Sequence, residues 1–97
     1  MTTPPLLSGD EIAERLIGTD WRLEHGMIVR DLEFDDFAAA VAHVNRVAEV
    51  AETHNHHPDM LIHGWNKVKL SLTNHAAGGL TEIDFDMAAR FDALRGA

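Results

Sequence analysis

The feature that most constrains this fold is an alternation of side-chain character in the C-terminal half of the chain. Between Trp65 and Thr73, the apolar residues Val68, Leu70 and Leu72 alternate with lysine, serine and threonine. Successive side chains of a β-strand point to opposite faces of its sheet, so this pattern predicts a strand with one apolar and one polar face. A sheet of such strands is covered by other elements on the apolar face alone. The alternation therefore favours an antiparallel sheet.

Three further runs predict the remaining strands. Residues 21–23 and 28–34 flank the turn signal Glu24-His25-Gly26 and predict a hairpin. Residues 60–62 predict a strand before the alternating one, with a bend or bulge at His63-Gly64. The links between these strands are short, which favours antiparallel pairing. We expect a four-stranded antiparallel sheet whose uncovered face is open to a partner subunit or a ligand.

Three helices are predicted around these strands. Ser8 and Glu11 form a capping box that starts the first helix, which Gly18 ends. Asp35 or Asp36 caps a long helix that stops before Pro58. The inward positions of the long helix are Phe37, Val41, Val44, Ala48 and Ala51, and those of a last helix that starts at Thr81-Glu82-Ile83-Asp84 are Ile83, Met87, Phe91 and Leu94.

The order of elements is helix, strand, strand, helix, strand, strand, helix. This order predicts an α+β two-layer sandwich with the helices on one face of the sheet. The chain has 97 residues, which suits one domain over residues 1–97, with residues 1–7 as a flexible tail. A domain of this size buries only about 60 to 65% of its unfolded surface, so association into an oligomer would add to its core.

Composition excludes several classes of function. Eight basic residues against sixteen acidic ones give a formal net charge of −8, which repels nucleic-acid phosphates. The sequence contains no cysteine, which removes disulfides, thiolate nucleophiles and cysteine-ligated zinc. No run approaches the roughly 20 apolar residues of a membrane span, and the first residues do not form a secretion signal. We expect a cytoplasmic protein that binds neither nucleic acid nor membrane.

Clustered histidines are the strongest candidates for chemistry. Pro58 restricts the backbone of His57 to extended geometry, so the adjacent imidazoles of His56 and His57 are held at a defined angle. Imidazoles titrate near neutral pH, so three of them supply both an acid and a base, as the loss of water from a substrate requires. Five of the seven histidines lie between residues 54 and 75, namely His54, His56, His57, His63 and His75.

The same residues allow less specific interpretations. Single histidines such as His25 and His43 are expected at the surface, and Asp84 also suits the first turn of a helix. Three imidazoles could ligate zinc, but the chain has no His-Glu-x-x-His pattern, and adjacent histidines before a proline rarely converge on one ion. We therefore expect no metal.

At these positions the chain resembles the pterin-4a-carbinolamine dehydratase family. The resemblance extends upstream through Trp21, residues 34–37 and residues 46–48, so it covers nearly the whole chain. The segments that carry it most clearly are Glu52, Asn55-His56-His57-Pro58, Trp65-Asn66-Lys67-Val68, Thr73, His75, Gly79-Leu80-Thr81 and Asp84.

The resemblance implies a hydro-lyase that converts a 4a-hydroxytetrahydropterin to quinonoid dihydropterin and water, without a cofactor, in tetrahydropterin recycling. It implies catalysis by His56, His57 and His75. It also implies a homodimer or homotetramer, linked in function to an aromatic amino acid hydroxylase. The residues it places at the substrate are Glu52, Asn55, Pro58, Trp65, Thr73 and Asp84.

Other functions remain open at this point. The same fold could serve as a non-enzymatic dimerisation or regulatory module, as animal members of the family do, or bind another pterin-like ring. A histidine-ligated metal-binding protein is the third alternative. The interval from Pro58 to Trp65 is one residue longer than in many family members, with Gly64 as the extra residue, so the strand register at this point is an open question.

Overall fold

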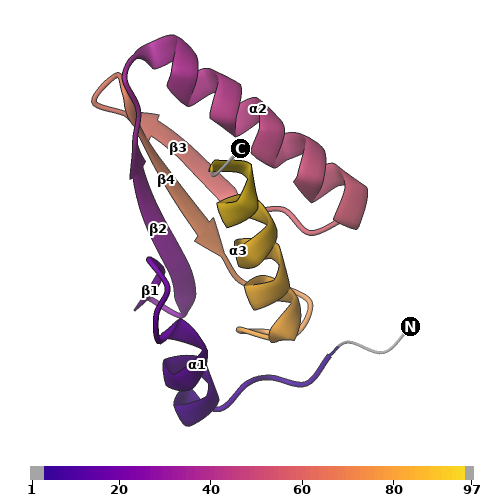
Figure 1. Cartoon of the computed structure of the whole chain (residues 1–97). Coiled ribbons are helices and arrows are strands. Elements are labelled where there is room, and N and C mark those ends of the chain that lie inside the picture. The colour runs from indigo at the N-terminus through magenta and orange to yellow at the C-terminus, as the bar shows by residue number, and fades with distance from the viewer. Residues whose placement is uncertain (1–3, 96–97) are drawn as a thin grey trace.

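The helices and strands follow the predicted order. The computed structural model describes residues 4–95. The sheet has the order β1-β2-β4-β3, and all neighbouring strands are antiparallel. Figure 1 shows α2 and α3 side by side over one face of this sheet and α1 at the end near β1. The elements are α1 (Gly9–Leu16), β1 (Arg22–Glu24), β2 (Met27–Glu33), α2 (Phe37–His54), β3 (Asp59–His63), β4 (Lys67–Leu72) and α3 (Glu82–Arg95).

The core lies between the sheet and the two long helices. Ile28 of β2 pairs with Leu72 of β4, and Leu32 pairs with Val68, so one face of both strands carries apolar side chains. These side chains are buried, as are Met87 and Phe91 of α3. The two-layer sandwich therefore forms because the period-2 pattern of the strands meets helices with buried apolar stripes.

The face of α2 that packs on the core differs in part from the predicted one. Ala51 is buried and Val44 packs against the core, as predicted, but the centre of the face lies elsewhere. The buried residues are Ala40, His43, Val47 and Ala51, whereas Phe37 is 56% exposed. His43 was expected at the surface, but only 1% of it is exposed, and its ring lies 5.0 Å from that of Phe34. Small side chains such as Ala40 and Ala51 let a helix pack closely on a sheet. The residues that face the core therefore lie next to the row that begins with the bulkier Phe37.

The link between β3 and β4 also differs from the prediction. Gly64 and Trp65 both have left-handed backbone conformations, with φ of 53° and 61°. A strand cannot continue through such residues, so Trp65 and Asn66 belong to the turn, and β4 begins at Lys67. The pairing of His63 with Lys67 fixes the register of β3 against β4.

Charged side chains cover the opposite face of the sheet. Arg22 bonds Asp31 at 2.7 Å and Glu24 at 2.9 Å, and Lys69 bonds Glu24 at 3.0 Å. Val29 lies on this face beside its partner Arg22, yet it is only 2% exposed. The ion pairs and the stems of the long side chains therefore shield Val29, whereas Leu61 of β3, which lies on the same face opposite Lys69, is 54% exposed.

Two other expectations concern the N-terminus and membranes. Residues 1–3 of the expected flexible tail lie outside the described part of the chain, but the Leu7 N–H donates to the Leu80 carbonyl at 2.9 Å. The tail is thus fixed to the loop before α3 at Leu7. Among residues 4–95, no helix combines the length and the apolar character that crossing a membrane requires.

Candidate active site

The end of α2 positions the first two candidate histidines. Asn55 caps the helix in the left-handed conformation, with φ of 50° and ψ of 42°, and reverses the direction of the chain. The His56 N–H donates to the Ala51 carbonyl at 3.1 Å, which anchors the reversed segment to the last turn. Pro58 then directs the chain into β3. The orientations of His56 and His57 therefore follow from the helix cap and the proline.

A tight loop after β4 carries the third candidate. Asn74 and Gly79 form an isolated β-bridge that closes this loop, and Gly78 takes the positive φ of 80° that the turn requires. His75 lies in the loop, exposed to solvent. Since the loop is closed by backbone bonds, the position of His75 is set by the end of β4.

Strand pairing brings the two segments together. Asp59 of β3 pairs with Ser71 of β4, so the same register continued by two residues puts His57 opposite Thr73. The segments border an open cavity of about 240 Å³, which we call the histidine cavity. It is lined by Asn55, His56, His57, Thr73, Asn74, His75 and Ala76.

His56 is paired with a buried carboxylate. Its Nε2 lies 2.6 Å from Oδ1 of Asp84, which is 0% exposed. The other oxygen, Oδ2, accepts the Thr81 N–H at 2.9 Å, and the Thr81 hydroxyl accepts the Ile83 N–H at 3.3 Å. Asp84 is therefore both a capping residue of α3 and the partner of His56. If the Asp84 carboxylate is ionised, its oxygens only accept, so Nε2 of His56 then carries the hydrogen of this bond and Nδ1 is left for proton exchange.

His57 has a carboxylate partner of a different kind. Its Nε2 lies 2.7 Å from Oε1 of Glu52, but the two side chains are 53% and 78% exposed. Solvent screens such a pair, so it orients the imidazole weakly compared with the buried pair of His56. The cavity thus has one buried and one exposed imidazole–carboxylate pair.

His75 has no hydrogen-bond partner for its ring among residues 4–95, so the ring is available to a ligand. It borders a second cavity of about 420 Å³ on its other side, which also contains His25 and Met27. The two cavities share Thr73, Asn74 and His75. The loop that carries His75 therefore borders both cavities.

The structure gathers most of the predicted site residues. His56, His57, His75, Asn55 and Thr73 line the histidine cavity, and Glu52 and Asp84 bond its histidines. Pro58 is half-buried beside them.

Trp65 is not brought to this cavity. It lies in the β3–β4 turn, 62% exposed. The pair Asp59–Ser71 at the cavity end and the pair His63–Lys67 at the turn end are four residues apart along each strand. With a rise of about 3.3 Å per residue, roughly 13 Å of the hairpin separates the turn from the cavity. Within one chain, the structure therefore does not bring Trp65 to the three histidines.

Two residues with polar side chains at the cavities, Asn74 and His25, were not among the predicted site residues. Asn74 is buried beneath the loop that carries His75, and its sequence signal is an asparagine at the end of a strand, where such residues form turns. His25 borders the neighbouring cavity, but its only signal is the turn Glu24-His25-Gly26, which points to a surface position.

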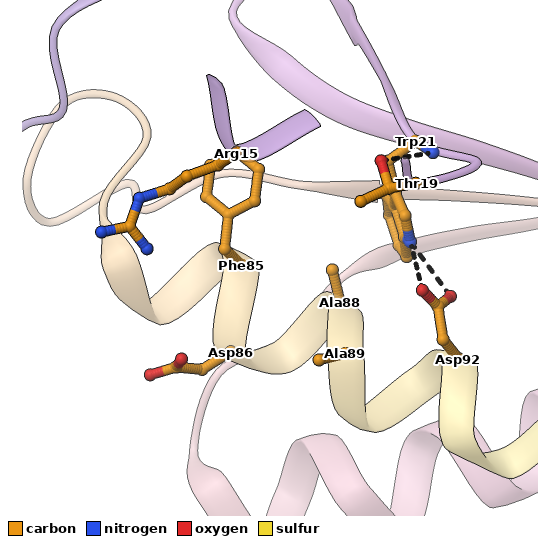
Figure 2. Close-up of a pocket in the computed structure, with 8 residues that line it drawn as sticks. All are labelled: Arg15, Thr19, Trp21, Phe85, Asp86, Ala88, Ala89 and Asp92. Carbon is orange, nitrogen blue, oxygen red and sulfur yellow. Dashed lines mark hydrogen bonds between the residues drawn. The ribbon is translucent and has the colours of Figure 1, made fainter. Parts of the chain in front are cut away.

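A third cavity lies away from the histidines, between α1 and α3. Figure 2 shows Trp21, whose indole N–H points at the carboxylate of Asp92, with distances of 3.0 and 3.1 Å to its two oxygens. This cavity of about 300 Å³ contains no histidine. Trp21 and Asp92 are thus bonded to each other, and Arg15 bonds Glu82, which lies outside the lining, at 2.6 Å. This cavity therefore lacks the proton-transfer groups of the histidine cavity.

Metal ligation has no candidate set in the described residues. Within residues 4–95, no three or more histidine, cysteine, aspartate or glutamate side chains are arranged to hold an ion. The two imidazoles closest to carboxylates, His56 and His57, each use Nε2 to bond an acid rather than to face a common point. The metal-binding alternative thus has no ligand set in this part of the chain.

Comparison with known proteins gives a consistent match. The family model described as pterin 4 alpha carbinolamine dehydratase matches residues 5–94. A protein of Chloroflexus aurantiacus is 50% identical over 93 residues, covering 95% of this chain and 99% of the relative. One of Acidobacterium capsulatum is 52% identical over 89 residues, covering 91% and 96%. Both are named, provisionally, as pterin-4-alpha-carbinolamine dehydratases.

Two solved structures share the fold. A transcriptional coactivator/pterin dehydratase from Brucella melitensis matches with a TM-score of 0.85 at 30% identity, covering 92% of this chain and 97% of the other. A pterin dehydratase-like protein identified as a RuBisCO assembly factor in the α-carboxysome matches with a TM-score of 0.67 at 26% identity, covering 82% and 94%. From the family match and these relatives, the chain belongs to the pterin-4a-carbinolamine dehydratase family.

Proposed function

We propose that this protein dehydrates a 4a-hydroxytetrahydropterin in the histidine cavity. The observation that carries the proposal is the meeting of three imidazoles from two separate segments around one cavity, two of them paired with carboxylates. Family membership supports the same reaction. The product is quinonoid dihydropterin, which places the protein in the recycling of the tetrahydropterin used by an aromatic amino acid hydroxylase.

The proposed reaction needs one acid and one base. The bond between the bridgehead carbon C4a and its hydroxyl oxygen breaks, and an imidazolium of His56 or His57 protonates the departing hydroxyl to give water. Another of the three histidines takes the proton from the adjacent ring nitrogen N5, whose electron pair forms the new C=N bond. No electron is transferred to another molecule, so the reaction proceeds without a cofactor. Each positioned acid or base contributes about 10² to 10⁴-fold to such a rate.

The surrounding residues serve to position the substrate in this proposal. Thr73 and Asn55 line the cavity, and Pro58 fixes the chain that follows the two histidines. Asp84 and Glu52 act through the imidazoles that they bond. Trp65 has no such role within its own chain, because the turn that carries it lies at the other end of the hairpin.

The test follows quinonoid dihydropterin formation from hydroxypterin generated by a hydroxylase, with the spontaneous reaction as the baseline. His57→Ala and His56→Gln should each lower kcat about 100-fold or more. Glutamine is chosen at His56 because it keeps a donor for the buried Asp84 carboxylate while removing proton transfer. His63→Ala is the matched control, since His63 is exposed and lies at the turn end of β3. Wild-type protein that gives no acceleration between about pH 6 and 8 would refute the proposal.

A second candidate is an interaction module without catalysis. The names of the two structural neighbours, a transcriptional coactivator/pterin dehydratase and a RuBisCO assembly factor, favour this alternative. An interaction role requires no proton transfer, so binding to a protein partner would be unaffected by His56→Gln. The absence of acceleration in the same assay would shift the preference to this role.

We further propose that the protein acts in the cytoplasm as a homodimer or homotetramer. β3 is an edge strand of the sheet, and its residues Met60 and Leu61 are 38% and 54% exposed. Phe37 on α2 is exposed as well. Apolar side chains at an unpaired edge favour association. Light scattering coupled to size-exclusion chromatography measures the mass, and a monomer at micromolar concentration would refute this part.

A further inference from the structure

We propose that Asn74 is a positioning residue that couples the loop carrying His75 to the buried partner of His56. This inference rests on the proposed dehydratase function, because it concerns the relative placement of the catalytic histidines. Asn74 directly precedes His75 in the chain, and 7% of it is exposed.

One side of Asn74 holds the His75 loop. Its Oδ1 accepts the Ala77 N–H at 3.2 Å, and its backbone carbonyl accepts the N–H groups of Ala77, Gly78 and Gly79 at 3.0 to 3.2 Å. The bridge between Asn74 and Gly79 closes the loop. The backbone that presents His75 is thus organised around this one residue.

The other side of Asn74 reaches the cap of α3. Its Nδ2 donates to the Thr81 hydroxyl at 3.3 Å, and Thr81 is 0% exposed. The Thr81 N–H donates to Oδ2 of Asp84, whose Oδ1 lies 2.6 Å from Nε2 of His56. A continuous chain of hydrogen bonds therefore runs from the His75 loop through Asn74, Thr81 and Asp84 to His56.

Asparagine suits this position because it offers an acceptor and a donor on one short, planar side chain. Both groups are used, one toward the loop and one toward the helix cap. A side chain without them would leave the Ala77 N–H and the Thr81 hydroxyl without these partners in a largely buried place. Misplacement of a reacting group by about 1 Å costs up to about 100-fold in rate, so a small shift of either histidine is enough to be measured.

The experiment compares Asn74→Ala with Asn66→Ala. Asn66 is a matched control because it is 9% exposed and its Nδ2 donates one hydrogen bond, to the Phe34 carbonyl at 2.9 Å, near the opposite end of β4. Both variants should lower Tm. Only Asn74→Ala should lower kcat, by about 10 to 100-fold. Only Asn74→Ala should also move the ¹⁵N signals of the His56 imidazole, to which the side chain of Asn74 makes no hydrogen bond.

A second pair of variants tests the contact with Thr81. Thr81→Ser keeps the hydroxyl, and Thr81→Val removes it with little change of shape. Thr81→Ser should retain the wild-type kcat and His56 signals. Thr81→Val should reproduce the Asn74→Ala effect, and the double variant Asn74→Ala/Thr81→Val should be no worse than either single one, because both break the same chain.

The outcomes separate this inference from the proposed function. Suppose that the wild-type protein is active. The positioning role is then overturned if Asn74→Ala and Asn66→Ala lose kcat equally, or if the His56 signals are unchanged in Asn74→Ala. Either result leaves the dehydratase proposal intact. Inactive wild-type protein refutes the dehydratase proposal, and the imidazole signals then still report whether Asn74 couples the two segments. A double variant whose effects simply add would also overturn the role.

Discussion

Replacing Asp84 by asparagine exchanges one oxygen for an NH₂ group in the most buried part of the site. The two oxygens of Asp84 accept the Thr81 N–H at 2.9 Å and face Nε2 of His56 at 2.6 Å. An asparagine has a single side-chain oxygen, so only one of these two donors can be satisfied. If the oxygen keeps the Thr81 N–H, the NH₂ group faces His56 and forces its ring to accept at Nε2 and carry the hydrogen on Nδ1.

The expected magnitudes follow from burial. A hydrogen bond to a charged group contributes about 1.5 to 3 kcal/mol, and Asp84 is 0% exposed, so little of this is lost to solvent screening. A loss of about 2 kcal/mol lowers Tm by about 8 to 16 °C in a domain of this size. Under the proposed function, His56 with the hydrogen on the wrong nitrogen should lower kcat about 100-fold or more.

Glu52→Gln is the matched control for Asp84→Asn. It makes the same chemical change beside His57, but in a pair whose side chains are 53% and 78% exposed. Exposed pairs contribute less than about 1 kcal/mol, so Tm should change by only a few degrees. The assays are thermal unfolding by circular dichroism and the dehydration rate. Equal losses of Tm and kcat in the two variants would refute the argument that burial makes Asp84 the stronger partner.

Three further predictions concern the fold. Phe91→Ala should cost about 3 to 5 kcal/mol in urea unfolding, because the ring is 1% exposed in the core. Gly26→Ala should cost about 1 to 2 kcal/mol by the same assay, since φ is +78° and the new Cβ meets no atom within 4 Å, which leaves backbone strain as the cause. The hydrogen bond from Lys69 holds the pKa of the Glu24 carboxyl below its ordinary value. Ionised Glu24 therefore stabilises the fold at pH values above its ordinary pKa, and this stabilisation is lost as the pH falls through the lowered pKa. Glu24→Gln should reduce the fall of Tm at acid pH.

The sheet could be predicted because its pattern has few alternatives. A strand of period 2 with one apolar face tolerates no shift of a single residue, since such a shift would expose Val68, Leu70 and Leu72 together. The capping box of Ser8 and Glu11 was predicted for a similar reason, because its residue types and spacing define the geometry. The strands and the start of the first helix were predicted correctly because each local pattern is compatible with one structure.

The face of α2 could not be predicted because two apolar stripes lie next to each other on that helix. Phe37 and Val41 belong to the bulkier stripe, but the sheet packs on Ala40 and Val47. A prediction from helical periodicity takes the most hydrophobic face of a helix as the buried one. Close packing of a helix on a sheet instead favours a face with small side chains. The face of α2 that is buried depends on the shape of the sheet surface, which cannot be read from the sequence of the helix alone.

The two imidazole–carboxylate pairs of the site also depend on tertiary structure that the local sequence does not reveal. Glu52 and His57 are five residues apart, a separation that does not put side chains on the same face of a helix. They meet because Asn55 takes the left-handed conformation and reverses the chain. Asp84 reaches His56 across 28 residues, through the packing of α3 beside α2. The sequence identified the residues, but the pairing depended on a helix cap and on tertiary packing.

The double role of Asp84 links the site to the fold. Its Oδ2 caps the first turn of α3, and its Oδ1 orients His56, so the orientation of His56 depends on the docking of α3 beside the loop that carries His75. A carboxylate that served His56 alone could be mobile, as the exposed Glu52 is beside His57. Because the cap fixes one oxygen of Asp84, the other can hold the imidazole without further loss of side-chain entropy. The sharing of one buried carboxylate between helix capping and imidazole orientation therefore ties the orientation of His56 to the fold, whereas His57 is paired with a carboxylate at the surface.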